Sequence, residues 1–340
     1  MFKSLQSLRY ISIIMVFLGH FQYGYMENFM SGGTLAVSCF TVLSGFVLSL
    51  AYGKKVDSED FSTWKFCLKF LKKVYPLHLL CTLYIILVNV EHMTWADYLE
   101  ILPSLLLIQS WIPIDTYYWG GNAVSWYLSN LLFAYAMFPT IQRFFNRLSD
   151  KKLTLFCVGL LTVFAVAIVF VPEDRVNDFI FINPLSRLVD FILGMAAYRM
   201  MAAYKPSDNK KVVNLIEFGC LAGAIATIAA YPHTCSKLRE SAIHWPASMA
   251  IIMFLCAHEK HTQGLLSSIL SKGGLYKLGN CTFEFFLIHF LIILTTVSLL
   301  NKHGISVSPL LLCVSLIVFT TAVSYVIHKL LSPKKHQHIK

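Results

Sequence analysis

The chain has 340 residues, of which 56% are apolar and only 14% are charged, and its formal net charge is +10. An average soluble domain has about 25% charged residues, so a soluble globule of this composition could not cover its surface with polar groups. Long apolar runs recur from end to end, and several can cross a hydrocarbon core of about 30 Å. The composition therefore predicts an all-α, polytopic membrane protein. It excludes disorder, collagen and coiled coil, and no connection is long enough for a separate soluble domain.

The apolar runs predict ten transmembrane helices, at residues 8–27, 34–51, 74–91, 122–142, 152–171, 182–203, 212–231, 242–258, 278–300 and 308–330. A further run at 98–112 carries Glu100 and Pro103 and ends at Pro113. We expect this run to form a re-entrant or interfacial helix that does not cross.

The distribution of positive charge supports this topology. With ten spans and Met1 in the cytoplasm, only four of the 28 lysines and arginines fall in outside connections, at Arg175, Lys237, Arg239 and Lys302, and Arg187 lies within a span. Lysine and arginine concentrate in cytoplasmic loops of membrane proteins. If 98–112 crossed, the basic cluster 143–152 would move outside. The positive charge is thus a topology signal, and no nucleic-acid partner is expected.

A single membrane domain is expected at residues 5–331, followed by a short basic cytoplasmic tail at 332–340 that faces anionic lipid. Residues 1–9 lead into an apolar run without a small-residue cleavage site, which predicts a retained first span. The nine cysteines include no C-x-x-C pair and lie mostly within apolar runs. We interpret them as small buried residues rather than as a disulfide or metal framework, and we expect no metal site.

Ionisable groups within transmembrane segments are rare and are functional candidates. Arg9 and His20 are eleven residues apart, which places both on one helix face, about 16 Å apart along the axis. Histidine is the side chain best suited to proton transfer near pH 7. The pattern fits either a base within the membrane with an anion anchor at the cytoplasmic side, or a packing histidine with a topology charge.

The other ionisable groups allow simpler interpretations. Arg187 and Asp190 are three residues apart, which favours an intramembrane ion pair. Glu284 and His289 do not share a helix face, so His289 is expected to meet another span. Structural or interfacial roles are expected for His78, Glu217 and His244.

Lys69, Lys72 and Lys73 fall on one face of a cytoplasmic helix end that closes with Tyr75 and Pro76. Three cations there suit a polyphosphate. The simpler alternative is that these lysines extend to the membrane surface and mark the cytoplasmic side.

Six short motifs follow one another in the chain. They are the basic residue and histidine at Arg9 and His20, Gly32-Gly33 with the stretch 41–46, the basic stretch 69–76, Trp126 with Leu128 and Ser129, Arg187 with Phe191 and Gly194, and the stretch 278–289 that ends at His289. This order, over residues 5–295, resembles acyltransferase family 3, whose members are multi-spanning membrane acyltransferases acting on glycans. The chain departs from the family pattern in two places. Asn130 to Phe133 replaces a frequent acidic motif after Ser129, and lysines replace the usual arginines at 69, 72 and 73.

The resemblance implies transfer of an acyl group, usually acetyl from cytoplasmic acetyl-CoA, to a hydroxyl of a cell-surface or lipid-linked glycan at the bacterial plasma membrane. The acyl-CoA is then a co-substrate, and no permanently bound cofactor is expected. The family's frequent extracellular esterase-like domain is missing, so a separate extracytoplasmic transferase is a possible partner, beside the membrane lipids.

The resemblance also assigns residues to roles. Arg9, His20, Glu284 and His289 are the catalytic candidates, with His20 as the base or as part of an acyl relay. Arg9, Lys69, Lys72 and Lys73 are candidates for donor binding, and Trp126, Ser129 and Arg187 for acceptor binding. Ser44 or Ser129 as a transient acyl acceptor is the alternative to direct transfer. Two other functions stay open, a transporter of a small anion or lipid-linked sugar and a non-catalytic member of a glycan-assembly complex.

Overall fold

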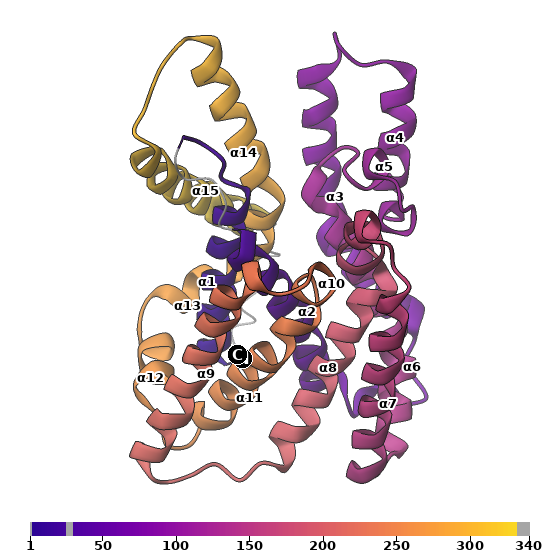
Figure 1. Cartoon of the computed structure of the whole chain (residues 1–340), viewed down its shortest axis with the longest axis vertical. Helices are drawn as coiled ribbons and strands as arrows, with labels where there is room; N and C mark the ends of the chain where they lie inside the picture. The colour runs from indigo at the N-terminus through magenta and orange to yellow at the C-terminus, as the bar shows by residue number, and fades with distance from the viewer. Residues whose placement is uncertain (1, 25–29, 332–340) are drawn as a thin grey trace, which may run out of the picture.

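The computed structural model describes residues 2–24 and 30–331, and every regular element within these ranges is helical (Figure 1). The predicted tail at 332–340 lies outside the described residues. Ten α-helices of fifteen or more residues occur in the described part: α1 (Lys3–His20), α2 (Met30–Tyr52), α3 (Thr63–Asn89), α6 (Trp126–Arg147), α7 (Asp150–Val169), α8 (Pro184–Ala203), α9 (Lys210–Ala230), α11 (Trp245–Glu259), α14 (Thr282–Lys302) and α15 (Pro309–Leu331). Each overlaps one predicted span, which confirms the all-α class.

Six segments of the described chain are long and apolar enough to cross a membrane: Gly32–Tyr52, Thr63–Asn89, Asp150–Val169, Lys210–His233, Leu275–Lys302 and Pro309–Leu331. The most apolar window of α7 is only 11% buried within the protein. An apolar helix exposed to this degree needs lipid around it. The chain is therefore a membrane protein, while the count of ten crossings stays a prediction.

Both predicted ends of the first span differ from the ends of α1. The first helix was predicted at 8–27 but ends at His20, because Phe21 adopts an extended conformation. Its start lies earlier than predicted, since the Glu259 carboxylate accepts hydrogen bonds from the backbone N–H groups of Lys3 (2.7 Å) and Ser4 (2.9 Å). A carboxylate at a helix N-terminus satisfies N–H groups that have no partner in the helix.

The run predicted as one helix at 98–112 is two elements, α4 (Trp95–Leu105) and the 3₁₀-helix η2 (Gln109–Trp111). Leu107 separates them with a φ of 55°. The N–H of Leu107 donates to the Ser104 carbonyl (3.1 Å) and that of Ile108 to the Pro103 carbonyl (3.0 Å). This left-handed termination ends α4. Whether the segment re-enters the membrane stays a prediction.

Polar contacts join the predicted cytoplasmic connections at one end of the bundle. Arg143 near the end of α6 donates to the Val56 carbonyl (2.8 Å), and Asn146 donates to the Gly53 carbonyl (2.8 Å). Arg199 at the end of α8 bonds Asp150 at the start of α7 (3.1 Å). In Figure 1 the α6–α7 turn and the α8–α9 connection lie at the lower end, and the α3–α4 and α14–α15 connections at the upper end. The first two connections were predicted to be cytoplasmic and the last two to be outside. Their positions at opposite ends agree with the predicted topology, in which the lower end is cytoplasmic.

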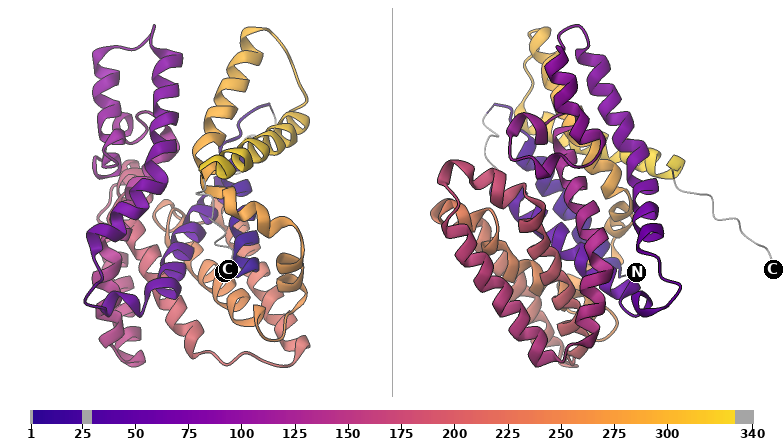
Figure 2. Two further views of the ribbon diagram at one scale, coloured as in Figure 1. Left: turned by 180° about the vertical axis from the view of Figure 1, so that it is seen from behind. Right: turned by 90° about the vertical axis from the view of Figure 1, so that its right-hand side faces the viewer.

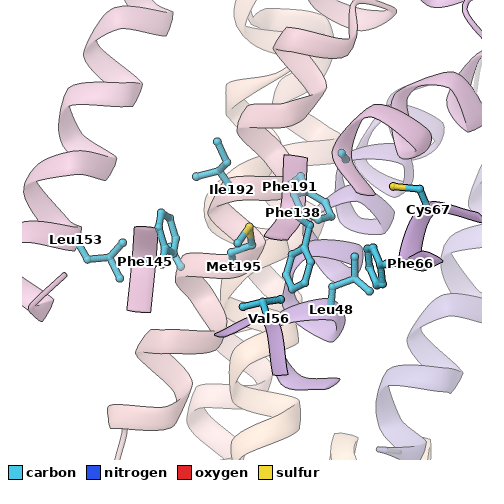
Figure 3. Close-up of a cluster of buried hydrophobic side chains, with 12 residues drawn as sticks. Leu48, Val56, Phe66, Cys67, Phe138, Phe145, Leu153, Phe191, Ile192 and Met195 are labelled. Atoms are coloured by element: carbon cyan, nitrogen blue, oxygen red, sulfur yellow. The ribbon is translucent and has the colours of Figure 1, made fainter. Parts of the chain in front are cut away.

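Helices α2 and α8 approach most closely through two glycines. A Cβ added at Gly45 would clash with the Phe191 carbonyl, and one added at Gly194 with the Val42 carbonyl. Small residues of this kind let helix backbones meet in membrane proteins. Around this contact, side chains of α2, α3, α6, α7 and α8 form a buried cluster in which the rings of Phe138 and Phe191 pack edge to face at 6.3 Å (Figure 3).

Helix α1 lies in the centre of the molecule, between α2 on one side and α14 and α15 on the other (Figures 1 and 2). Its apolar side chains Ile13, Val16 and Phe17 pack against Phe285 of α14 and Leu312 and Leu316 of α15. This packing fixes the helix that carries Arg9 and His20.

The described part of the chain contains all nine cysteines, each unpaired. Cys235 is exposed, and the other eight are buried or half-buried.

Candidate functional site

A cavity of about 430 Å³ lies between α1, α2, α3, α6, α14 and α15. We call it the central cavity. Its lining includes the titratable side chains of Arg9, His20, Lys73 and His328, and no aspartate or glutamate of the described chain lines it. Ligand sites are commonly apolar cavities of this size with a few polar groups. The charge of the lining favours an anionic ligand.

Two histidines meet at one part of the central cavity. His20 is the last residue of α1 and half-buried, and His289 of α14 is fully buried. The His289 Nε2 atom lies 3.2 Å from the His20 Nδ1 atom. The expectation that His289 meets another span is confirmed by this contact.

The neighbouring carbonyls decide where the protons of the two imidazoles lie. The His289 Nδ1 atom is 2.7 Å from the Phe286 carbonyl oxygen, which only accepts, so this nitrogen carries the proton. In neutral His289 the Nε2 atom is then an acceptor. The His20 Nδ1 atom, 2.9 Å from the Val16 carbonyl oxygen, must be the donor in both of its contacts. This arrangement leaves the lone pair of neutral His20 on Nε2, the form that a general base requires.

The basic residues predicted to hold the donor do not all reach the central cavity. Arg9 of α1 and Lys73 of α3 both line it, and Lys73 lies within electrostatic range of Arg9. All three lysines are exposed, but Lys69 and Lys72 do not line the cavity, and the Lys69 Nζ atom is 3.5 Å from the Tyr52 hydroxyl. Of these three lysines, Lys73 is therefore the one that lines the central cavity.

Glu284 is separated from the histidine pair. Its side chain is 7% exposed, and its Oε1 atom accepts a hydrogen bond of 2.9 Å from the Nδ1 atom of His328 on α15. Because Glu284 and His289 are five residues apart on α14, they face different helices. Sequence reasoning did not find His328, since a histidine near a cytoplasmic helix end is usually an interfacial residue.

Not all of the residues predicted to bind the acyl acceptor line the central cavity. Trp126 lines the central cavity, packing against Phe181 with a centroid distance of 5.1 Å. Ser129 is buried and does not line it, whereas Ser44 does and donates to the Phe40 carbonyl (2.8 Å). Arg187 is 1% exposed and lies outside the lining.

Arg187 holds together the segments around the central cavity. It forms the predicted ion pair with Asp190 (2.7 Å) and donates to the Phe181 carbonyl (2.9 Å). It also donates to the carbonyls of Ile180 and Glu240, while Asp190 accepts from the Trp245 indole.

Glu217, predicted to be interfacial, is instead buried and accepts from the N–H groups at the start of α12 (Leu265–Lys272).

Two short elements cover the central cavity on the predicted outer side. They are α5 (Asp115–Tyr118) and the π-helix η5 (Asn177–Phe181). The Tyr118 hydroxyl donates to Asp178 (2.7 Å), and Asn177 donates to the Tyr118 oxygen (3.0 Å). Burial first, and then the neighbouring Asp178, raise the pKa of Tyr118, so the phenol stays a donor. Sequence reasoning missed this cover, since a π-helix has no clear sequence signal, although such turns are frequent at functional sites.

The chain is similar to known acyltransferases over most of its length. A family model described as an acyltransferase domain, that of acyltransferase family 3, matches residues 2–329. A curated relative from Streptomyces mycarofaciens, named acyltransferase MdmB, is 27% identical over 320 residues, which cover 85% of this chain and 78% of the relative. No solved structure matches. Because the family model covers nearly the whole chain, the protein belongs to acyltransferase family 3.

Proposed function

We propose that this protein is a membrane O-acyltransferase that moves an acetyl group from cytoplasmic acetyl-CoA to a hydroxyl of a cell-surface or lipid-linked glycan. The observation that carries the proposal is the His20–His289 contact, which leaves the His20 Nε2 atom as a base in a cavity that also holds Arg9 and Lys73. The protein then lies in the bacterial plasma membrane, surrounded by its lipids, with both termini in the cytoplasm.

The donor enters from the cytoplasmic end. Its phosphates meet Arg9 and Lys73, the arginine and lysine of the cavity lining. His20 lies eleven residues beyond Arg9 on the same helix face, about 16 Å along the axis. The thioester at the far end of the extended pantetheine arm therefore reaches toward the base while the phosphates stay with the cations.

The acceptor enters under the cover made by α5 and η5. Trp119, Trp126 and Phe181 offer aromatic faces in the lining, and Asn177 offers an amide. Aromatic faces suit the apolar C–H face of a sugar ring, and the amide suits its hydroxyls. A separate extracytoplasmic transferase is the proposed partner if the acetylated product needs a second transfer.

The proposed reaction is direct transfer. The His20 Nε2 atom takes the proton of the sugar hydroxyl, and the oxygen attacks the thioester carbonyl carbon. The C–S bond breaks, and the CoA thiolate takes the proton back as it leaves. Ser44, the serine of the lining, already donates to a backbone carbonyl of its own helix, so the proposal uses no acyl-serine intermediate.

Two measurements test this function. Purified protein should bind labelled acetyl-CoA saturably, which a sugar or anion transporter would not require. Mass spectrometry of the surface glycan from cells with and without the gene should then show the loss of acetyl units from one sugar. Saturable donor binding with an unchanged glycan would instead favour a different acceptor, and absence of donor binding would contradict the acyltransferase proposal.

A further inference from the structure

The pair of Glu284 and His328 lies beside the basic part of the central cavity and has no role in the proposed proton transfer. His328 lines this cavity together with Arg9 and Lys73, so imidazole, guanidinium and ammonium come from α15, α1 and α3. Lys73 is within electrostatic range of both Arg9 and Glu284. Four charged or titratable groups from four helices therefore converge on one region.

Glu284 supplies the negative charge of this region. One of its oxygens accepts from the His328 Nδ1 atom at 2.9 Å, while the other oxygen is buried and has no hydrogen-bond partner. A buried carboxylate is stable only beside positive charge. The carboxylate therefore orients the imidazole. With His328 protonated, three positive charges face one negative charge, and the excess is positive.

We propose that His328, oriented by Glu284, is the third cationic group of a phosphate subsite that it shares with Arg9 and Lys73. The ligand is the pyrophosphate of the acyl donor. This inference rests on the proposed function, because it needs a phosphate-bearing donor. Glu284 is then a positioning residue for donor binding and takes no part in the proton transfer at His20.

The assignment makes donor affinity depend on pH. A phosphate binds an imidazolium more strongly than a neutral imidazole, and histidine is the side chain that ordinarily changes charge between about pH 5 and pH 8. Affinity should therefore fall as the pH rises through this range.

Other titratable groups lie on the elements packed around His328. They are Glu284 on α14, Cys281 in the 3₁₀-helix η8 (Gly279–Cys281), Arg9 and Tyr10 on α1, Lys73 on α3, and Tyr325 and Lys329 on α15 itself. His20 lines the same cavity about 16 Å from Arg9 along α1, and His289 of α14 contacts His20. A substitution at His328 leaves all of these groups in place, so the resulting change in donor affinity is due to His328.

The test measures binding and not turnover. The probe is dephospho-CoA, which keeps the pyrophosphate but lacks the phosphomonoester whose own ionisation near pH 6 would confuse the result. Binding to the purified full-length protein is measured by calorimetry at about pH 6 and about pH 8. Wild type should bind more tightly at the lower pH.

The variants separate the contributions. His328→Gln should weaken binding about tenfold at the lower pH, the scale of one lost charge-assisted hydrogen bond, and should abolish the pH dependence. His328→Lys should restore affinity at both pH values, because the charge is then permanent. Glu284→Gln should weaken binding at the lower pH, because the imidazole loses the carboxylate that orients it. Lys329→Gln is the control, since Lys329 is exposed and lies outside the lining.

The outcomes distinguish this inference from the function on which it rests. If wild type binds dephospho-CoA and His328→Gln binds it with unchanged affinity and unchanged pH dependence, this inference is wrong and the proposed function stands. If wild type binds neither acetyl-CoA nor dephospho-CoA, the proposed function fails together with it.

Discussion

His20 and His289 illustrate how one residue can determine the chemistry of another. The backbone carbonyl of Phe286 fixes the proton of His289, and His289 in turn fixes that of His20. Second-layer partners of this kind hold a histidine in one tautomer and one orientation. In this account His289 is a positioning residue and His20 is the proposed base.

We predict that His289→Ala lowers kcat at least tenfold with little change in donor affinity, because His20 loses one of the two acceptors that orient its ring while Arg9 and Lys73 are untouched. His289→Gln should recover part of the rate, since its amide oxygen can accept from the same nitrogen. His258→Ala is the matched control. His258 is also fully buried and also bonds the carbonyl four residues earlier, but it lies outside the central cavity. A wild-type kcat in His289→Ala would contradict the positioning role.

The three lysines at 69, 72 and 73 should differ in function despite their shared helix face. Lys73→Ala should raise the KM for the donor about tenfold, because a charge-assisted hydrogen bond to phosphate contributes about 1.5–3 kcal/mol. Contacts remote from the acyl carbon act mainly on binding, so kcat should change little. Steady-state kinetics of Lys72→Ala provide the comparison, because Lys72 is also exposed but lies outside the lining. Equal effects of the two substitutions would show that a position in the cavity lining does not separate the two lysines.

At the scale of elements, the long helices were predictable and the short ones were not. A buried or lipid-facing apolar run indicates a helix directly, and each of the ten runs coincides with one. The end of α4 could not be predicted, because Leu107 adopts a positive φ that sequence patterns assign to glycine. The early start of α1 could not be predicted either, since it depends on Glu259, a residue 256 positions away.

The same limit explains which site residues were found. Arg9 and His20 share a helix face, and their spacing is visible in the sequence. The contacts of His289 with His20 and of Glu284 with His328 join α14 to two other helices, so helix periodicity cannot reveal them. Lys73 separates from Lys69 and Lys72 only when the neighbours of α3 are known.

The close approach of α2 and α8 gives a prediction about stability. Gly194→Ala should destabilise the protein by about 1–3 kcal/mol, because the added methyl group would meet the Val42 carbonyl at a packed helix contact. Gly159→Ala in α7 should be neutral or stabilising by up to about 1 kcal/mol, since nothing lies within 4 Å of the added atom and alanine favours the helix. Thermal unfolding in detergent compares the two. An unchanged midpoint for Gly194→Ala would mean that the helices can separate without cost.

At the scale of the whole molecule, the account depends on which end faces the cytoplasm. Gly53 and Val56 are bonded to α6 at the same end as the turn between α6 and α7. In a Cys235→Ser background, Ser58→Cys should therefore resist an impermeant thiol reagent added to intact cells and react after permeabilisation. The native Cys235, which is exposed, should react from outside. Efficient labelling of Ser58→Cys in intact cells would reverse the topology and place the donor site on the wrong side.

The central claim is that one cavity brings a cytoplasmic acyl donor to a base that activates the acceptor. The most direct measurement is acyl transfer by His20→Gln in proteoliposomes, with labelled acetyl-CoA binding measured on the same preparation. Glutamine keeps a hydrogen-bonding group of similar size but cannot act as a base. We predict unchanged donor affinity with transfer reduced by about 10² or more, the usual scale for loss of general-base catalysis. Near-normal transfer by His20→Gln would contradict the account.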